Sequence, residues 1–211
     1  MLELPKEILD ALSFMRGQLS GLIRFDTEYL PIRVVFAPDG RVVAPVMESM
    51  LRSSDCAIYL PEEPREADDE IAQLMVTLDR FEESGPDGAL ADRWRIYHGE
   101  PEDVRWAAMT IDFCKFGGFA FDGEAVTQAN PLEAIEPILC REVNPSREQE
   151  LKQAVLARVQ VDMEAPRLVG VDPLGFDIRG RFEVSRIPVA TPMADEAAAR
   201  ARLDEILAGS D

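Results

Sequence analysis

The segment at residues 167–207 constrains the fold most strongly, because three short β-rich runs are followed there by one amphipathic helix. A sheet this small has to bury its apolar face against helices, so the pattern predicts a compact α/β unit. Two further helices are expected just before it, one after the pair Asn130-Pro131 and one started by the capping box at 146–149. The apolar contacts of the unit are expected from Leu168, Val171, Phe176, Ile178, Ile187, Leu203, Ile206 and Leu207.

The first 125 residues have the periodicity of an antiparallel β protein. After a helix at 4–20, β-rich runs are expected at 32–36, 41–47, 56–60, 71–78, 93–98, 104–113 and 116–121. The tetrad at 37–40, Ala-Pro-Asp-Gly, predicts a hairpin turn because Gly40 can adopt positive φ. Exposed loops are expected at 61–70 and 82–88, and a bulge at the glycine pair 117–118. The predicted fold class is therefore α+β, with a barrel over 1–125 and a small C-terminal α/β domain over 126–211.

The chain is strongly acidic, since 22 basic residues stand against 40 acidic ones and give a formal net charge of −18. A field of this sign repels phosphate backbones and anionic membranes, so neither nucleic acid nor membrane is expected as a partner. The charged N-terminus does not have the pattern of a signal peptide. Cys56, Cys114 and Cys140 are widely spaced and predict neither a disulfide framework nor a zinc site. These features together favour a reducing cytoplasm.

The usual catalytic motifs are missing from the sequence. No G-x-G-x-x-G, Walker A, H-E-x-x-H or G-x-S-x-G element occurs, so no catalytic residue is assigned. His98 is the only histidine, and a single imidazole builds neither a catalytic triad nor a multi-histidine metal centre. A structural role for His98 at the end of the run 93–98 is favoured over proton transfer.

A cluster of arginine and hydroxyl groups predicts an anion site. Arg33 and Arg41 lie in the two runs of the hairpin, and Ser49, Arg52 and Ser53 crowd the connection that follows. Several N–H and O–H donors that converge on one position bind phosphate, and arginine does so bidentately. The alternative is a polar turn in which Asp39 and Asp55 are the ion partners of these groups.

The C-terminal pattern also resembles a known family. VGVDPLGFDIRG, then the basic strand RFEVSRIPV and an acidic amphipathic helix, resembles the small C-terminal domain of HugZ-like haem-utilisation proteins. That resemblance implies an antiparallel split β-barrel of the FMN-binding, pyridoxamine 5′-phosphate oxidase type before this domain. The family's H-x-N-x-D-H motif corresponds to residues 142–147, where Asn144 is kept and both histidines are absent. Where the family carries S-x-L-A-x-H-T-x-N, this chain has residues 49–54, in which Ser49 and Arg52 supply the serine and a basic residue while the histidine, threonine and asparagine are absent.

The resemblance leads to three functional hypotheses. In the first, the chain is an FMN-binding, homodimeric split-barrel protein, either a flavin-dependent oxidoreductase or a flavin carrier. Its phosphate would be held by Arg33, Ser49, Arg52 and Ser53, and Trp94 or Trp106 would line the ring pocket for this small-molecule ligand. The second is a non-catalytic dimeric module of the same fold without cofactor. The third is a haem-binding protein without flavin, ligated by His98, a cysteine or a tyrosine.

Overall fold

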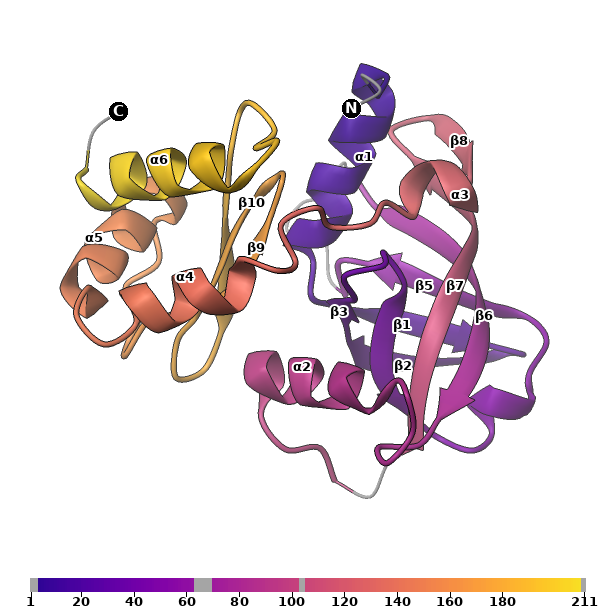
Figure 1. Cartoon of the computed structure of the whole chain (residues 1–211). Coiled ribbons are helices and arrows are strands. Elements are labelled where there is room, and N and C mark those ends of the chain that lie inside the picture. The colour runs from indigo at the N-terminus through magenta and orange to yellow at the C-terminus, as the bar shows by residue number, and fades with distance from the viewer. Residues whose placement is uncertain (1–3, 63–69, 103–104, 210–211) are drawn as a thin grey trace. The chain divides into compact units, whose positions relative to one another are not determined.

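The computed structural model describes residues 4–62, 70–102 and 105–209 (Figure 1). Its internal contacts divide the chain into two compact units, residues 2–129 and 130–211. The boundary expected from the sequence, between residues 125 and 126, lies close to this division and stays a prediction about independent domains. Most of the expected acidic loop at 61–70 falls at 63–69, outside the described residues.

Residues 2–129 form a mixed unit around one antiparallel sheet. Its strands pair in the order β2-β1-β5-β6-β7-β4-β3, and β8 pairs with β7. Their bounds are β1 Ser20–Phe25, β2 Glu28–Arg33, β3 Val35–Phe36, β4 Val42–Val46, β5 Cys56–Leu60, β6 Ala72–Phe81, β7 Arg105–Phe116 and β8 Phe119–Asp122. The strands expected at 56–60, 71–78 and 104–113 are therefore confirmed within the described residues.

The sheet curls because its two ends belong to one stretch of chain. β2 and β3 stand at opposite ends of the strand order, yet only Val34 separates them in sequence. The chain pairs first with β1 and then, after Val34, with β4, which brings both ends of the sheet together. The interior is apolar, with fully buried side chains such as Ile23, Ile58 and Leu74.

The run at 93–98 is helical, which corrects the strand expected there. It is the second half of helix α2, Gly88–His98, and Trp94 and Tyr97 are buried on it together with Ala91. Burial every third residue is the helical repeat. Arg93 to His98 alternates polar and apolar residues over only six positions, which imitates a strand. Ile96, which such a strand would bury, is 51% exposed.

Two hairpin turns differ from expectation. Asp26 and Thr27 connect β1 to β2 without glycine or proline, and Asp26 takes φ of +51° in the left-handed region. Asp is among the few residues that adopt this region readily, so the sequence signal for the turn is weak. Gly117 and Gly118 form the turn between β7 and β8, with φ of +56° and +79°, where a bulge was expected. The turn at Gly40, with φ of +92°, is confirmed.

Three short helices or turns complete this unit. Helix α1, Lys6–Gly17, begins the described chain and buries Ala11, Leu12 and Met15. The 3-10 turn η1, Met50–Arg52, lies between β4 and β5, and helix α3, Gly123–Val126, follows β8. The helix expected at 4–20 is thus confirmed, with its end at Gly17.

Residues 130–211 form a three-stranded antiparallel sheet and three helices. The sheet order is β11-β10-β9, and the elements are α4 Glu136–Val143, α5 Glu148–Val159, β9 Arg167–Asp172, β10 Gly175–Arg179, β11 Val184–Pro188 and α6 Glu196–Leu207. All eight apolar positions expected to pack in this unit are buried, with exposures of 5% or less. The period-two pattern of the strands and the spacing of the last helix identified them correctly.

The helix starts in this unit were only partly predicted. Asp195 caps α6 by accepting a hydrogen bond from the Ala198 N–H, at 2.9 Å. The capping box at 146–149 is wrong, because α5 begins at Glu148 after Arg147 and no side chain caps it. Asn130 caps a turn by accepting from the Leu132 N–H, and the helix itself begins five residues later than expected, at Glu136 and not at Pro131.

Candidate functional site

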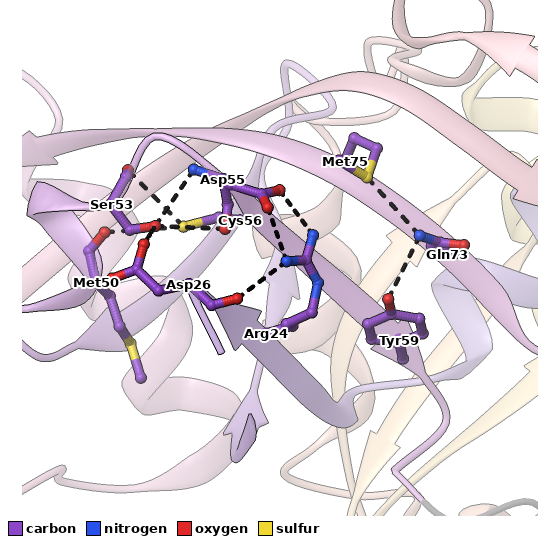
Figure 2. A network of polar contacts seen from close by, with 9 residues as sticks. All are labelled: Arg24, Asp26, Met50, Ser53, Asp55, Cys56, Tyr59, Gln73 and Met75. Carbon is purple, nitrogen blue, oxygen red and sulfur yellow. Dashed lines mark hydrogen bonds and ion pairs between the residues drawn. The ribbon is translucent and has the colours of Figure 1, made fainter. Parts of the chain in front are cut away.

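The connection from β4 to β5 lies beside the turn between β1 and β2, and polar contacts join the two (Figure 2). The Ser53 hydroxyl donates to Asp26 Oδ1 at 2.8 Å and accepts from the Asp55 N–H at 3.2 Å. Arg24 donates through Nη1 and Nη2 to the two carboxylate oxygens of Asp55, at 2.8 and 2.7 Å. The last residue of β1 pairs with the first of β5, which places these groups together.

The charges of this cluster stabilise one another. The hydrogen bond to Asp55 raises the pKa of Arg24 above its usual range, and a hydrogen bond to Tyr59 adds to this. The same bond from Arg24 lowers the pKa of Asp55. A bidentate guanidinium–carboxylate pair is geometrically specific. Arg24 and Asp55 therefore stay charged and paired at neutral pH.

The expected phosphate donors near this cluster also contact carboxylates. Arg52 is 77% exposed and pairs with Glu48 at 3.3 Å, one helical turn earlier. Arg41 pairs with Asp39 at 2.7 Å and with Asp87 at 3.1 Å. Asp39 is thus the ion partner of Arg41, as the polar-turn alternative expects, whereas Asp55 pairs with Arg24, which lies outside the expected set of donors. Ser49 is exposed and precedes η1 without capping it.

Arg33 lies at the other end of β1 from Ser53. It pairs with Ser20, the first residue of β1, whereas the Ser53 hydroxyl bonds to Asp26, which follows the last residue of β1. Five residues of strand separate Ser20 from Phe25, which corresponds to about 17 Å at roughly 3.3 Å per residue. That span exceeds the reach of one phosphate group. The chain does not bring Arg33 together with Ser53.

Trp94 and Trp106 do come together. Both are 4% exposed, and their rings meet edge to face with centroids 5.7 Å apart. The Trp94 indole N–H donates to the Arg33 carbonyl at 2.9 Å, and that of Trp106 donates to Glu83 Oε1 at 2.8 Å. The hydrogen bond from Arg95 is the main cause that lowers the pKa of Glu83, and the hydrogen bond from Trp106 adds to it. The two indoles form a packed aromatic cluster with both N–H groups hydrogen-bonded.

Helix α2 directs three polar side chains onto the bend between β2 and β3. Besides Trp94, Arg93 Nε donates to the Phe36 carbonyl at 2.9 Å, and His98 Nε2 lies 3.0 Å from the Val34 carbonyl. A carbonyl only accepts, so His98 carries its proton on Nε2. Its ring packs against Trp94 at 4.8 Å. His98 therefore has a structural role at the bend, as the sequence favoured.

Two of the three cysteines, Cys56 and Cys114, are buried thiols. Burial raises the pKa of Cys114 to about 11, and burial is also the main cause that raises the pKa of Cys56. Both thiols are therefore protonated at neutral pH, and the thiolate is the nucleophile and metal ligand. Across residues 4–62, 70–102 and 105–209, no three histidine, cysteine or acidic side chains are grouped to hold a metal ion.

Asn144, which the sequence resemblance singled out, hydrogen-bonds to the backbone at the edge strand β9. Its Nδ2 donates to the Leu168 carbonyl at 2.9 Å, and its Oδ1 accepts from the Leu168 N–H at 2.8 Å. Asn130 and Glu136 do the same for Val171, donating to its carbonyl and accepting from its N–H. These amide and carboxyl groups replace the neighbouring strand that an edge lacks. The role of Asn144 is therefore structural: its side chain provides hydrogen-bond partners for the backbone of Leu168.

Replacing Asn144 by alanine should lower the free energy of unfolding by about 1–3 kcal/mol, because the Leu168 N–H and carbonyl lose their partners. Calorimetry suits this test, since every tryptophan and tyrosine lies within residues 2–129 and fluorescence reports on that unit alone. Ser146→Ala is the matched control. Its hydroxyl caps no helix, so the change should stay within about 0.5 kcal/mol. A Ser146→Ala variant less stable than Asn144→Ala would reverse this assignment.

A buried charged network crosses the three strands of the C-terminal unit. Arg186 on β11 donates through Nη1 to Asp177 at 2.7 Å and through Nη2 to Asp172 at 2.5 Å. Burial alone would lower the pKa of Arg186, but the two carboxylates outweigh it and raise that pKa. This network was not predicted from the sequence. Its signal is one charged residue within each of three otherwise mostly apolar runs, LVGVD, GFDI and VSRIP.

Comparisons with known proteins bear on the fold. No family model matches the chain, and no curated protein matches it. Among solved structures it is similar to the protein Atu2129, of unknown function, from Agrobacterium tumefaciens, with a TM-score of 0.73, 14% identity and 98% of both chains covered. It also matches a heme binding protein from Mycobacterium smegmatis, with a TM-score of 0.49, 17% identity and 97% of both chains covered. The first likeness shows that the whole fold occurs in another solved protein.

A helix needs about 20 consecutive, mostly apolar residues to span a bilayer. Within the described part of the chain, none of the helices is long and apolar enough to span a membrane.

Proposed function

We propose that the chain is a non-catalytic, dimeric split-barrel module that holds no flavin and acts through its surfaces. One observation carries this proposal: two of the four donors of the expected phosphate site, Ser53 and Arg52, already bind carboxylates of the same chain. Ser53 donates to Asp26, and Arg52 pairs with Glu48. Arg24, the guanidinium nearest to Ser53 in this network, is held by both oxygens of Asp55.

A phosphate at this position would meet unfavourable electrostatics. It would have to break the pairs of Arg24 and Arg52 and then lie beside the carboxylates of Asp26 and Asp55. Two unit charges about 4 Å apart interact with roughly 4 kcal/mol at an effective dielectric constant of about 20. A charge-assisted hydrogen bond returns only about 1.5–3 kcal/mol. The exchange is therefore unfavourable in a single chain.

The split-barrel type is supported by the strand order and by the hairpin at 35–46. The curled sheet with contiguous ends and the confirmed turn at Gly40 fit the expectation from the resemblance. In that fold the cofactor chemistry belongs to the flavin, and the protein only binds and orients it. A barrel in which Ser53 and Arg52 are bound to carboxylates of the same chain would keep the architecture without the chemistry of the flavin.

Haem ligation by His98, Cys56 or Cys114 finds little support in their contacts. His98 Nε2 is engaged with the Val34 carbonyl and its ring is packed against Trp94. Cys56 and Cys114 are buried thiols with raised pKa values, which disfavours the thiolate that an iron ligand requires. The haem hypothesis thus has no histidine free to act as the axial ligand.

A flavin shared between two copies is the second candidate, because Arg33 and Ser49 are both exposed. Arg33 cannot reach Ser53 of its own chain, but it could meet the 49–53 connection of a partner chain. Binding of this kind would require the dimer and would be lost in Arg33→Ala. It would differ from binding within one chain, which Arg33→Ala would not change.

Titration with FMN and with riboflavin, followed by quenching of flavin fluorescence, tests the proposal. We expect no saturable binding of either compound up to about 1 mM, which corresponds to a binding free energy weaker than about −4 kcal/mol. Saturable binding of FMN that is stronger than that of riboflavin would contradict the proposal. If Arg33→Ala then abolished it, the shared site would be the better account.

A further inference from the structure

The outward side of the barrel sheet carries two rows of side chains across β2, β1, β5, β6 and β7. Residues directly opposite each other in an antiparallel register share a face. The first row is Pro31, Leu22, Tyr59, Gln73 and Lys115, and the second is Tyr29, Arg24, Ala57, Met75 and Phe113. We refer to these ten residues as the outer face.

The outer face has an unusual composition for the exterior of an acidic protein. It contains no carboxylate, whereas the chain has 40 acidic residues, and seven of its ten side chains are apolar or aromatic. Tyr29 is 55% exposed and its ring lies 6.0 Å from that of Tyr59. When one face of an antiparallel sheet packs on the core and the other meets water, the face that meets water normally carries polar residues. Three residues of this face are exposed, six are half-buried, and Ala57 is fully buried. An apolar face that stays partly exposed to water is typical of a surface that another molecule covers.

The positive groups of the outer face add little net charge. Arg24 is neutralised by Asp55, which leaves Lys115 as the one cation of the ten residues without a carboxylate partner among the contacts described above. Gln73 Nε2 donates to the Tyr59 hydroxyl at 3.4 Å, so polar atoms at its centre already have partners within the face. The centre of the face is therefore apolar and close to neutral.

We propose that a second copy of this chain packs its outer face against the first. Two chains with a net charge of −18 repel each other, so they approach best where the local charge is close to zero, as on this face, where the Asp55 carboxylate is paired with Arg24. Protein interfaces are enriched in tyrosine, methionine and arginine and depleted in aspartate and glutamate, which is the composition of this face. The contact is isologous, with the same residues on both sides. The inference rests on the dimer of the proposed function and assigns its interface.

Charge reversal on the outer face should separate the two copies. Met75 lies on β6 near the centre of the second row and is half-buried, so Met75→Glu places a carboxylate opposite its symmetry mate. Ile96→Glu is the matched control, because Ile96 is an exposed apolar residue of the same unit, on α2 and off the outer face. Both variants add the same charge to the chain.

Light scattering with gel filtration at tens of micromolar measures the outcome. We expect about twice 23.5 kDa for the wild type and for Ile96→Glu, and the single-chain mass for Met75→Glu. Circular dichroism checks that both variants are folded. A dimeric Met75→Glu would overturn the assigned face and leave the proposed dimer standing. A monomeric wild type would overturn both.

A salt series on the wild type tests the same contact without a mutation. The screening length falls from about 30 Å at roughly 0.01 M salt to about 3 Å at roughly 1 M. An apolar contact between two like-charged chains is strengthened when their repulsion is screened, so the dimer fraction at low concentration should rise with salt. A dimer fraction that falls with salt would show an interface made of ion pairs and would overturn the inference even if Met75→Glu does not fold.

Discussion

Phe176→Ala should lower the free energy of unfolding of residues 130–211 by about 3–5 kcal/mol, the range for removing a buried phenylalanine ring. Phe176 lies on β10 opposite Val171 and Ile187, and it is 1% exposed. It belongs to the core that the sheet shares with the three helices. Domains are stable by only about 5–15 kcal/mol, so this one change removes a large part of the stability.

Calorimetry should show this loss as a lower unfolding temperature for the C-terminal transition, with tryptophan fluorescence of residues 2–129 unchanged. Phe182→Ala is the control, because the same ring in the same unit is 77% exposed there. Its effect should stay within about 0.5 kcal/mol. Equal stability of the two variants would show that the core of this unit lies elsewhere.

Arg186→Met should cost about 3–5 kcal/mol in the same unit, because it leaves two buried carboxylates without the guanidinium between them. The loss should shrink as the pH is lowered. Buried carboxylates without a cation have raised pKa values, so their destabilising charge is present above those values and is neutralised below them. The wild type should not show this gain in acid.

Two further variants separate the network from a general effect of losing arginine. Arg181→Met removes an arginine that is 62% exposed and pairs with Glu164, and it should change stability by at most about 1 kcal/mol. The triple variant Arg186→Met, Asp172→Asn, Asp177→Asn should recover part of the loss, since no buried charge remains. A triple variant less stable than Arg186→Met alone would contradict this reading of the network.

Much of the fold could be predicted because burial follows sequence period where the elements are regular. The sequence of β10 alternates between apolar and polar residues, and Phe176 and Ile178 belong to the core as this pattern indicates, although Asp177 between them is buried as well. A short stretch of alternating residues fits a strand or a helix equally well. The sequence at 93–98 therefore predicts a strand, whereas these residues form the end of α2. The hairpin of β1 and β2 was missed because Asp26 and Thr27 carry no glycine or proline signal.

The candidate site was less predictable, since its contacts depend on strand register. The pairs Arg24 with Asp55 and Ser53 with Asp26 join residues 31 and 27 positions apart. Periodicity shows that each residue is polar, but it does not say which carboxylate lies next to which donor. Register also separates Arg33 from Ser53 along β1. Residue types alone indicated an anion site, and their placement indicates internal ion pairs.

The visible absorption spectrum of the purified protein tests the flavin-free barrel most directly. It should be recorded as purified and again after incubation with excess FMN and gel filtration. We expect no flavin bands in either sample, because Arg24, Arg52 and Ser53 are bound to carboxylates of their own chain. Flavin bands retained through gel filtration at about one FMN per chain would contradict the proposal.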